Sequence, residues 1–309
     1  MESRRKITVE DRVQTVELRS GERSDAITLS AGGSLVPGAV VGGRYRIDRQ
    51  LGAGGMAKVW LADDLERRMQ VAFKEMLVPT LRSAAELEES TLLFRREYYA
   101  MKKLQHPGTV KVFDCGVMET GNRYITMEVV RGRDLCEVAS RPLPAGEVRR
   151  ILERMAQILG FVHSRLFVHC DIKAENVRLT DSGDVKLMDF GIMHPIGTRA
   201  TGKAWGTPEY MAPEWREHGI IDGRSDLYSL GVLAFFLLTK MTPSKTVSRR
   251  RSGSGVVATP LELSALNNVE PALTAVILRL LERDPRDRFA SAAELVAALH
   301  AASGEPVLR

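Results

Sequence analysis

The residues whose types and spacing could best take part in a chemical reaction lie in one short segment, Val168 to Asn176, and in the residues that follow it. Asp171 can accept the proton of an attacking hydroxyl, and Lys173 can stabilise the negative charge of a transferring group. Asn176 and Asp189 offer oxygen atoms, which are the ligands that Mg²⁺ prefers. Any one of these side chains alone would most simply be a surface residue, but their order and spacing are specific. The segment predicts a metal-assisted phosphoryl-transfer site.

A glycine cluster lies between two predicted strands. Gly52, Gly54 and Gly55 allow backbone N–H groups to approach phosphate oxygens closely, because no Cβ intervenes. No helix follows directly and no Gly-Lys-Ser/Thr is present, which excludes a dinucleotide fingerprint and a Walker loop. Taken alone, such a cluster is more often an ordinary hairpin turn.

Lys74 lies on an apolar predicted strand, fifteen residues after Val59. A lysine that points inward needs a partner, and Glu97 on the following predicted helix can supply one. Such a pair would hold the lysine where it contacts two phosphates. Without that partner, Lys74 would be an ordinary surface residue.

The elements that must position these residues form a strand-rich part and a helical part. Strands are predicted at Tyr45–Leu51, Val59–Ala62, Met69–Met76, Val110–Phe113 and Tyr124–Val129. Helices are predicted at Ala84–Leu104, Gly146–Ser164, Ser225–Thr239, Glu270–Glu282 and Ser291–Ala302. A five-stranded antiparallel unit with one helix, joined to a larger helical unit, predicts a cleft between two lobes.

Together these motifs resemble the bacterial serine/threonine branch of the eukaryotic-type (Hanks-type) protein kinase family. The likeness covers about residues 44 to 302, and the motifs follow the family's order. They are the glycine loop, Val71-Ala72-Phe73-Lys74, Glu97, the catalytic loop, Asp189-Phe190-Gly191 and the segment Gly206 to Glu214. The resemblance implies an α+β bilobal kinase fold. The implied parts are an N-lobe at 44–128, a hinge at 128–132, a C-lobe at 133–302 and a tail at 303–309.

The resemblance also implies a site for ATP with Mg²⁺, or with Mn²⁺ as an alternative. The nucleotide-binding residues it implies are Leu51, Gly52, Gly54, Gly55, Val59, Ala72, Lys74, Met127, Glu128, Val130, Asn176 and Asp189. The catalytic residues it implies are Asp171, Lys173, Lys74 and Glu97, with Asn176 and Asp189 as metal ligands. Met127 would be the gatekeeper next to the hinge. Lys173 and Thr207 favour serine and threonine acceptors.

Three supports for the site follow from the same resemblance. Asp226 would brace the catalytic loop, and Arg288 would pair with Glu214. A stack of side chains would mark the active state, although ordinary core packing predicts the same burial. The stack consists of Met101, His169 and Phe190.

Cys170 stands where the family has an arginine before the catalytic acid. That arginine binds a phosphorylated residue of the activation segment. Without it, the candidate phosphosites Thr198 and Thr201 lose their main anchor. We therefore expect an activity that depends little on phosphorylation between Gly191 and Glu214.

Three other positions depart from the family pattern. Ala57 replaces the third glycine, where small residues are tolerated. Arg178 falls where an apolar side chain forms the floor of the adenine site, so ATP affinity is in question, although an arginine stem can lie against a ring while its head reaches water. The basic stretch 248–255 is interpreted as a flexible loop, as an autophosphorylation site at Ser252 or Ser254, or as a docking patch for an acidic partner.

The composition agrees with a folded enzyme and excludes several classes. The chain is 44% hydrophobic and 27% charged with a net charge of +5, which indicates an arginine-rich surface and no nucleic-acid partner. Its three cysteines show no metal-binding spacing, and its longest apolar run has nine residues, against about 20 for a membrane span. We therefore expect a cytoplasmic location and no membrane segment. Residues 1–40 are interpreted as a partly disordered arm, or as one that docks on the kinase or carries phosphosites.

The main hypothesis is an active kinase that phosphorylates serine and threonine hydroxyls of proteins, including its own. The alternative is a pseudokinase that binds ATP as a signalling scaffold, and the complete set of transfer residues argues against it. A small-molecule kinase of related fold is a third hypothesis, which the segment Gly206 to Glu214 and Asp226 disfavour. Whether the chain forms a homodimer is left open.

Overall fold

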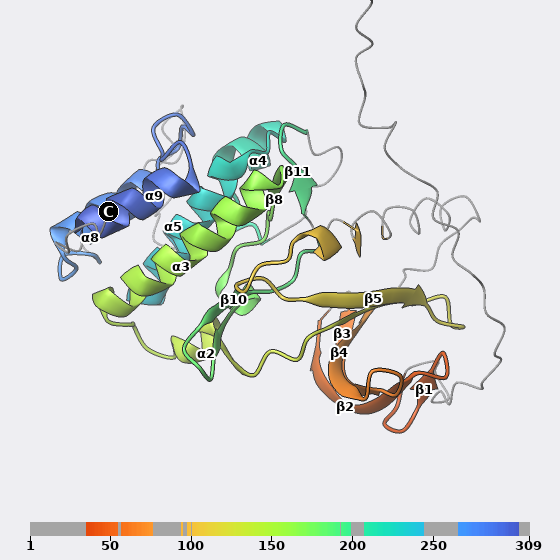
Figure 1. Ribbon diagram of the computed structural model, residues 1–309. Coiled ribbons are helices and arrows are strands. Elements are labelled where there is room, and N and C mark those ends of the chain that lie inside the picture. Colours follow the sequence, from red (N-terminus) through yellow and green to blue (C-terminus); the bar gives the residue numbers. More distant parts are fainter. Residues whose placement is uncertain are drawn as a thin grey trace, which may run out of the picture.

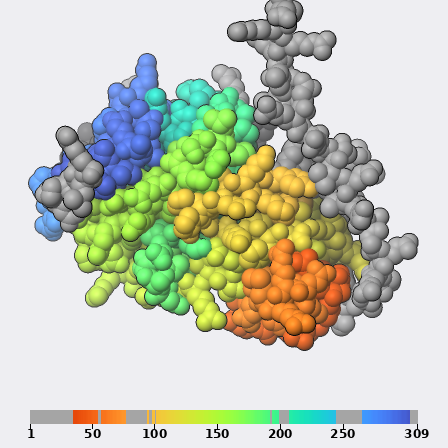
Figure 2. Space-filling view, in the orientation of Figure 1, coloured from red at the N-terminus to blue at the C-terminus, as the bar shows by residue number. Residues whose placement is uncertain are grey.

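The computed structural model shows two lobes, one built on strands and one on helices (Figure 1). It describes residues 35–54, 57–76, 94, 98–99, 101–191, 193–198, 207–243 and 265–302. The first strands and the last helices lie at opposite ends of the molecule (Figure 2). The predicted α+β bilobal fold is confirmed.

The small lobe is a curled antiparallel sheet with the strand order β1-β2-β3-β4-β6-β5. The bounds are Val40–Val41 (β1), Tyr45–Ala53 (β2), Ala57–Asp64 (β3), Met69–Met76 (β4), Val112–Val117 (β5) and Arg123–Met127 (β6). Five of these strands are the predicted ones, and β1 adds a short edge strand. Parts of the predicted helix are also described: Phe94, Tyr98 and 101–103 are helical.

The alternation of side chains along β4 separates core from cleft. Val71 and Phe73 are fully buried in the core of the small lobe, and Phe73 stacks on Tyr124 with ring centroids 4.6 Å apart. Ala72 and Lys74 point to the opposite face, where they line the cleft between the lobes. The period of two therefore places the predicted lysine on the site side of the sheet.

The start of β5 differs from the prediction, which put a strand at Val110–Phe113. The structure begins β5 at Val112 because the preceding residues bond to the large lobe instead. Val110 N donates to Leu187 O at 3.1 Å, and Thr109 forms a bridge with Leu187. Local propensity cannot reveal this long-range backbone pairing.

Residues 35 to 41, which precede the family-like region, pack against the small lobe. Leu35, Ala39 and Val41 are each at most 2% exposed and lie in the same core as Phe73. Two backbone hydrogen bonds of 2.8 Å, Gly38 N to Ile47 O and Ile47 N to Ala39 O, hold the segment to β2. The segment thus covers apolar surface that the sheet would otherwise expose.

The large lobe is built around a central helix, α5. Its helices are α2 (Leu135–Val138), α3 (Ala145–Ser164), α4 (Pro213–His218), α5 (Gly223–Thr239), α8 (Pro271–Leu280) and α9 (Ala292–Ala302). Its short strands are β7 (Gly132–Asp134), β8 (Phe167–Val168), β9 (Val177–Thr180), β10 (Val185–Leu187) and β11 (His194–Pro195). Asp222 caps α5 by accepting a hydrogen bond from Arg224 N at 2.7 Å, and the helix is buried on nearly all sides.

None of the helices in the described part of the chain combines the length and hydrophobicity needed to cross a membrane.

A buried ion pair fastens the edge of the small lobe. Asp64 is fully buried and accepts hydrogen bonds from Arg44 Nε at 2.9 Å and Arg44 Nη2 at 2.7 Å. Arg44 also contacts Asp114 at 2.9 Å, which ties β3 to β5. Mainly because Arg44 hydrogen-bonds its carboxylate, the pKa of Asp64 lies below its ordinary value.

We predict that Asp64→Asn lowers the free energy of unfolding at pH 7 by about 3 kcal/mol, because it removes the buried charge that pairs with Arg44 and leaves that guanidinium only its more exposed contacts with Asp114 and Glu66. Since the folded pKa is depressed, the stabilisation by Asp64 is complete above the ordinary carboxyl pKa of about 4 and is lost as pH falls through the folded value. Urea unfolding at several pH values measures this, and the difference from wild type should shrink in acid. Asp63→Asn, in an exposed pair with Arg46, is the matched control and should cost under about 1 kcal/mol. Equal effects of the two variants would contradict the prediction.

Candidate active site

A cleft of about 330 Å³ separates the two lobes and is lined by residues of both. The predicted nucleotide residues that line it are Leu51, Gly52, Val59, Ala72, Lys74, Met127, Glu128, Val130, Asn176 and Asp189. Gly54 lies in the hairpin above, where its N–H donates to Ala57 O at 2.8 Å. Gly55 and Glu97 lie outside the described residues.

The catalytic-loop side chains converge on the carboxylate of Asp171. Asn176 Nδ2 donates to Asp171 Oδ2 at 2.7 Å, and Lys173 Nζ lies 2.9 Å from the same oxygen. Thr207 Oγ1 donates to the other oxygen at 3.3 Å and accepts from Lys173 Nζ at 3.0 Å. An acid, a cation and a hydroxyl from segments far apart in sequence therefore form one bonded cluster.

Asn176 is oriented so that its amide oxygen is available to a ligand. Its Nδ2 group donates to both the backbone and the side chain of Asp171, at 2.9 and 2.7 Å. Asn176 and Asp189 line the same cleft, and both offer oxygen atoms that suit a hard cation. The described residues contain no group of three or more His, Cys, Asp or Glu side chains that could hold a metal. This donor set fits an ion that takes its remaining ligands from water and phosphate.

Lys74 meets Asp189 across the cleft, with Nζ 2.5 Å from Oδ1. Desolvation opposes ionisation of Asp189, but the charge and hydrogen bond of Lys74 outweigh it and hold the pKa below its usual range. Asp189 also has φ of 47°, a left-handed conformation that is uncommon for a residue with a side chain. The structure thus brings together the lysine and the acid that the sequence places 115 residues apart.

Asp226 anchors the catalytic loop to helix α5 through hydrogen bonds. Its buried carboxylate accepts hydrogen bonds from His169 N and Cys170 N, both at 2.9 Å, and from His163 Nε2 at 2.8 Å. Cys170 has φ of 69°, so this loop is held in a strained conformation. Asp226 therefore provides the brace that the sequence predicts for it.

Two members of the predicted stack, His169 and Phe190, contact each other, and the third, Met101, is buried in the same core as Phe190. His169 and Phe190 contact edge to face with ring centroids 4.7 Å apart, and both are buried together with Met101. Burial lowers the pKa of His169, so the ring stays neutral at physiological pH. Its Nε2 donates to Met188 O at 3.1 Å, and its Nδ1 accepts from Asp171 N at 3.2 Å. The histidine thereby links the loop of Asp171 to the strand that leads to Asp189.

Residues 45–299 match the family model described as the protein kinase domain. The chain belongs to this protein kinase family. It is 35% identical to the serine/threonine-protein kinase pkn3 of Myxococcus xanthus over 286 residues, which are 87% of this chain and 51% of that protein. It is 37% identical to PksC of Streptomyces coelicolor over 270 residues (82% and 48%) and 31% identical to PrkC of Bacillus subtilis over 277 residues (85% and 41%).

These comparisons confirm the resemblance to bacterial serine/threonine kinases. The chain spans about half or less of the length of these three relatives. The family as a whole uses ATP and a divalent metal and acts on proteins.

An apolar cluster surrounds Cys170, next to the candidate catalytic acid Asp171. Cys170 is 5% exposed and packs with Val168, Met211, Trp215 and Ile221. Burial raises the pKa of its thiol, so the group is a neutral packing residue. The cluster joins β8 to α4 through apolar side chains.

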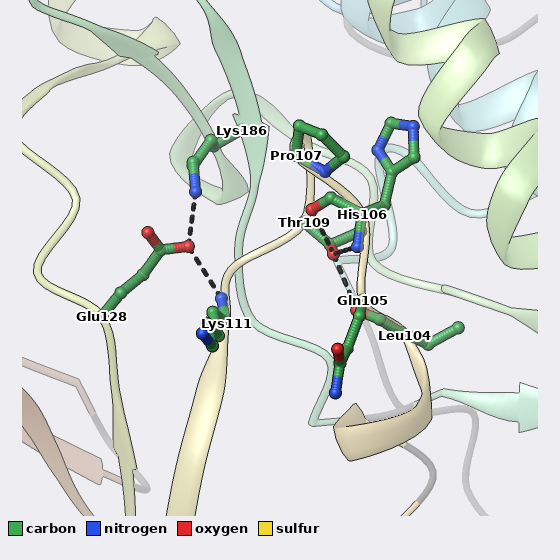
Figure 3. A pocket seen from close by; sticks show the side chains of 8 residues that line it. All are labelled: Leu104, Gln105, His106, Pro107, Thr109, Lys111, Glu128 and Lys186. Atoms are coloured by element: carbon green, nitrogen blue, oxygen red, sulfur yellow. Dashed lines mark hydrogen bonds and ion pairs between the residues drawn. The ribbon is translucent and has the colours of Figure 1, made fainter.

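Glu128 ties the hinge of the kinase to both lobes on the side of a second cavity, of about 290 Å³ (Figure 3). Its Oε1 accepts from Lys111 N at 2.8 Å and from Lys186 Nζ at 2.5 Å. The carboxylate is thus engaged in holding the hinge. The backbone N–H and C=O groups of the hinge are therefore the groups left to hydrogen-bond a nucleotide base in the main cleft.

Sequence reasoning did not assign seven of the residues that line the cleft to the site: Met76, Val110, Val112, Ile125, Asp134, Glu175 and Met188. Glu175 lies inside the catalytic-loop motif and Met188 directly precedes Asp189, so adjacency to the motifs is the signal that could have found them. Asp134 lacks such a signal, because its place depends on the pairing of β7 with β9. Two candidate phosphosites, Ser252 and Ser254, lie outside the described residues, as does Thr201.

Thr198 is described, and its Oγ1 donates to Pro195 O at 2.7 Å. Because the described side chains packed around Cys170 are apolar and offer no cation to a phosphate, we predict that Thr198→Ala/Thr201→Ala keeps turnover within about threefold of wild type, a change of under 1 kcal/mol in barrier. Steady-state transfer from labelled ATP to a generic basic protein measures this. Thr207→Ala is the contrasting variant, and it should lose more than tenfold because it breaks two bonds at Asp171 and Lys173. A double mutant that lost most of its turnover would show that a phosphate anchor exists.

Proposed function

We propose that this protein is an active serine/threonine kinase that transfers the γ-phosphate of Mg²⁺-ATP to protein hydroxyls, its own included. The proposal is carried by the bonded cluster of Asp171, Lys173 and Thr207, which adjoins a cleft containing Lys74 and Asp189. A base, a cation and candidate metal ligands lie along one path from the nucleotide to an acceptor. That is the arrangement that in-line phosphoryl transfer requires.

Each side chain has a role that follows from its position. Asp171 would accept the proton of the acceptor hydroxyl, and Lys173 would stabilise the negative charge on the transferring group. Lys74 would contact the phosphates from the small lobe, with Glu97 proposed as its partner. Bound Mg²⁺, or Mn²⁺ in its place, would neutralise phosphate charge. Asn176 and Asp189 would hold it.

The nucleotide would bind with its base at the hinge and its phosphates under the glycine loop. Val59 and Ala72 line the cleft from the small lobe, next to the gatekeeper Met127. Hinge residues Glu128 to Val130 would offer backbone hydrogen bonds to the base. Gly52, Gly54 and Gly55 would bring N–H groups to the phosphates.

We further propose protein substrates with serine or threonine acceptors and a cytoplasmic location. Thr207, bonded to both Asp171 and Lys173, supports the choice of acceptor. The sequence has three cysteines with no CxxC spacing, which agrees with a reducing compartment. The domain limits proposed from the sequence are 44–302 for the kinase domain and 1–40 for the extension.

We predict that Asp171→Asn lowers phosphoryl transfer by about 10² to 10⁴, because it removes the proton acceptor. ATP binding should stay within about twofold, a difference of under 0.5 kcal/mol. Labelled ATP with Mg²⁺ and a generic basic protein reports transfer, intact-mass measurement reports autophosphorylation, and calorimetry reports binding.

The matched control is Asp181→Asn, an exposed acid in the turn after β9, which should leave transfer unchanged. Transfer that survived in Asp171→Asn would refute the assigned base. A wild type that bound ATP but transferred nothing with Mg²⁺ or Mn²⁺ would instead support the pseudokinase alternative.

A further inference from the structure

Arg178 is an unusual residue in the cleft because it brings a charge to the face opposite Val59 and Ala72. It belongs to β9 in the large lobe, whereas those two residues belong to the sheet of the small lobe, and all three line the same cleft. The family resemblance places an apolar side chain at this position. The side chain is only partly exposed, so its charge is not simply surrounded by water.

A hydrogen bond to the neighbouring strand fixes the guanidinium. Arg178 Nε donates to Gly132 O at 3.2 Å. Gly132 has φ of 125°, and a Cβ there would collide with the carbonyl of Leu179. Glycine therefore permits β7 to approach β9 closely enough for this bond. The bond ties the planar group to the sheet surface that faces the cleft.

The charged neighbours of Arg178 are already engaged elsewhere. In the sheet β10-β9-β7, Arg178 lies between Lys186 and Asp134. Lys186 pairs with Glu128 at the second cavity (Figure 3). Asp134 accepts a hydrogen bond from Glu137 N at 2.9 Å as the cap of α2. Within the described part of the chain, the two terminal nitrogens of Arg178 have no hydrogen bond or ion pair.

The position of Arg178 points to the base end of the nucleotide rather than to the phosphates. Its strand partner Asp134 follows the hinge closely in sequence, and its hydrogen-bond acceptor Gly132 ends the hinge. Lys74 and Asp189, the candidate phosphate and metal contacts, are paired with one another. A planar, weakly hydrated cation in this place is suited to lie against an aromatic ring.

We propose that the guanidinium of Arg178 stacks beneath the purine base of the bound nucleotide and determines the affinity of the site for it. This inference rests on the proposed function, since it assumes that ATP occupies the cleft. It assigns to this kinase a cationic floor in place of an apolar one. Because the contact is with the base, it contributes equally to ATP, ADP and adenosine.

The test measures binding of ATP, ADP and adenosine to the full chain by calorimetry in Mg²⁺. Arg178→Met keeps an unbranched aliphatic side chain and supplies an apolar floor. Arg178→Lys keeps the positive charge but lacks the planar guanidinium. Arg133→Met is the matched control, because Arg133 is exposed on the adjacent strand β7, does not line the cleft and pairs in register with Leu179. Thermal unfolding of each variant verifies that the fold is intact.

We expect Arg178→Met to weaken all three ligands about fivefold, the size of one partly desolvated cation–π contact. Arg178→Lys should show most of that loss, and Arg133→Met none. Wild-type affinity for adenosine in Arg178→Met would overturn the inference. So would a loss confined to ATP and ADP, because it would place the guanidinium on the phosphates.

The proposed function is tested separately by the wild type. If the wild type bound none of the three ligands, the proposed function would fail and the stacking contact with it. If the wild type bound them and Arg178→Met bound them equally well, only the inference about Arg178 would fail.

Discussion

The carboxylate of Asp226 is the constraint on which the rest of the site depends. It is fully buried, and an unpaired charge there would be strongly unfavourable. Three donors from two segments satisfy it, and two of them are the backbone N–H groups of His169 and Cys170. The catalytic loop can therefore hold its strained conformation only while α5 is in place. The position of Asp171 is set from the core of the large lobe.

A buried ion pair extends the same scaffold toward the segment that includes Thr207. Arg288 and Glu214 are paired through two hydrogen bonds of 2.8 Å, and Arg288 is 1% exposed. Ser225 of α5 donates to the same glutamate at 2.9 Å. The segment that includes Thr207 is thus anchored to the same helix as the catalytic loop. Both sides of the bonded cluster at Asp171 share one rigid support.

The sequence predicted most of the strands and helices of both lobes, for reasons that are local. Motif residues such as Asp171 and Asn176 are close in the chain, so a single loop brings them together. In the structure, alternation along β4 puts Lys74 on the cleft side. The start of β5 and the place of Asp134 escaped prediction, because each depends on backbone pairing between distant strands. The partner of Lys74 in the structure, Asp189, belongs to the same class of long-range contact.

The packing of residues 35 to 41 has a practical meaning for how the domain is delimited. The family match begins at residue 45, beyond this segment. A fragment cut at that point would lack the buried side chains of Leu35, Ala39 and Val41 and the hydrogen bonds to β2. It would expose the apolar side of Tyr45 and Ile47 at a free sheet edge, which invites self-association. The shortest expression fragment that avoids this self-association should therefore start upstream of Leu35.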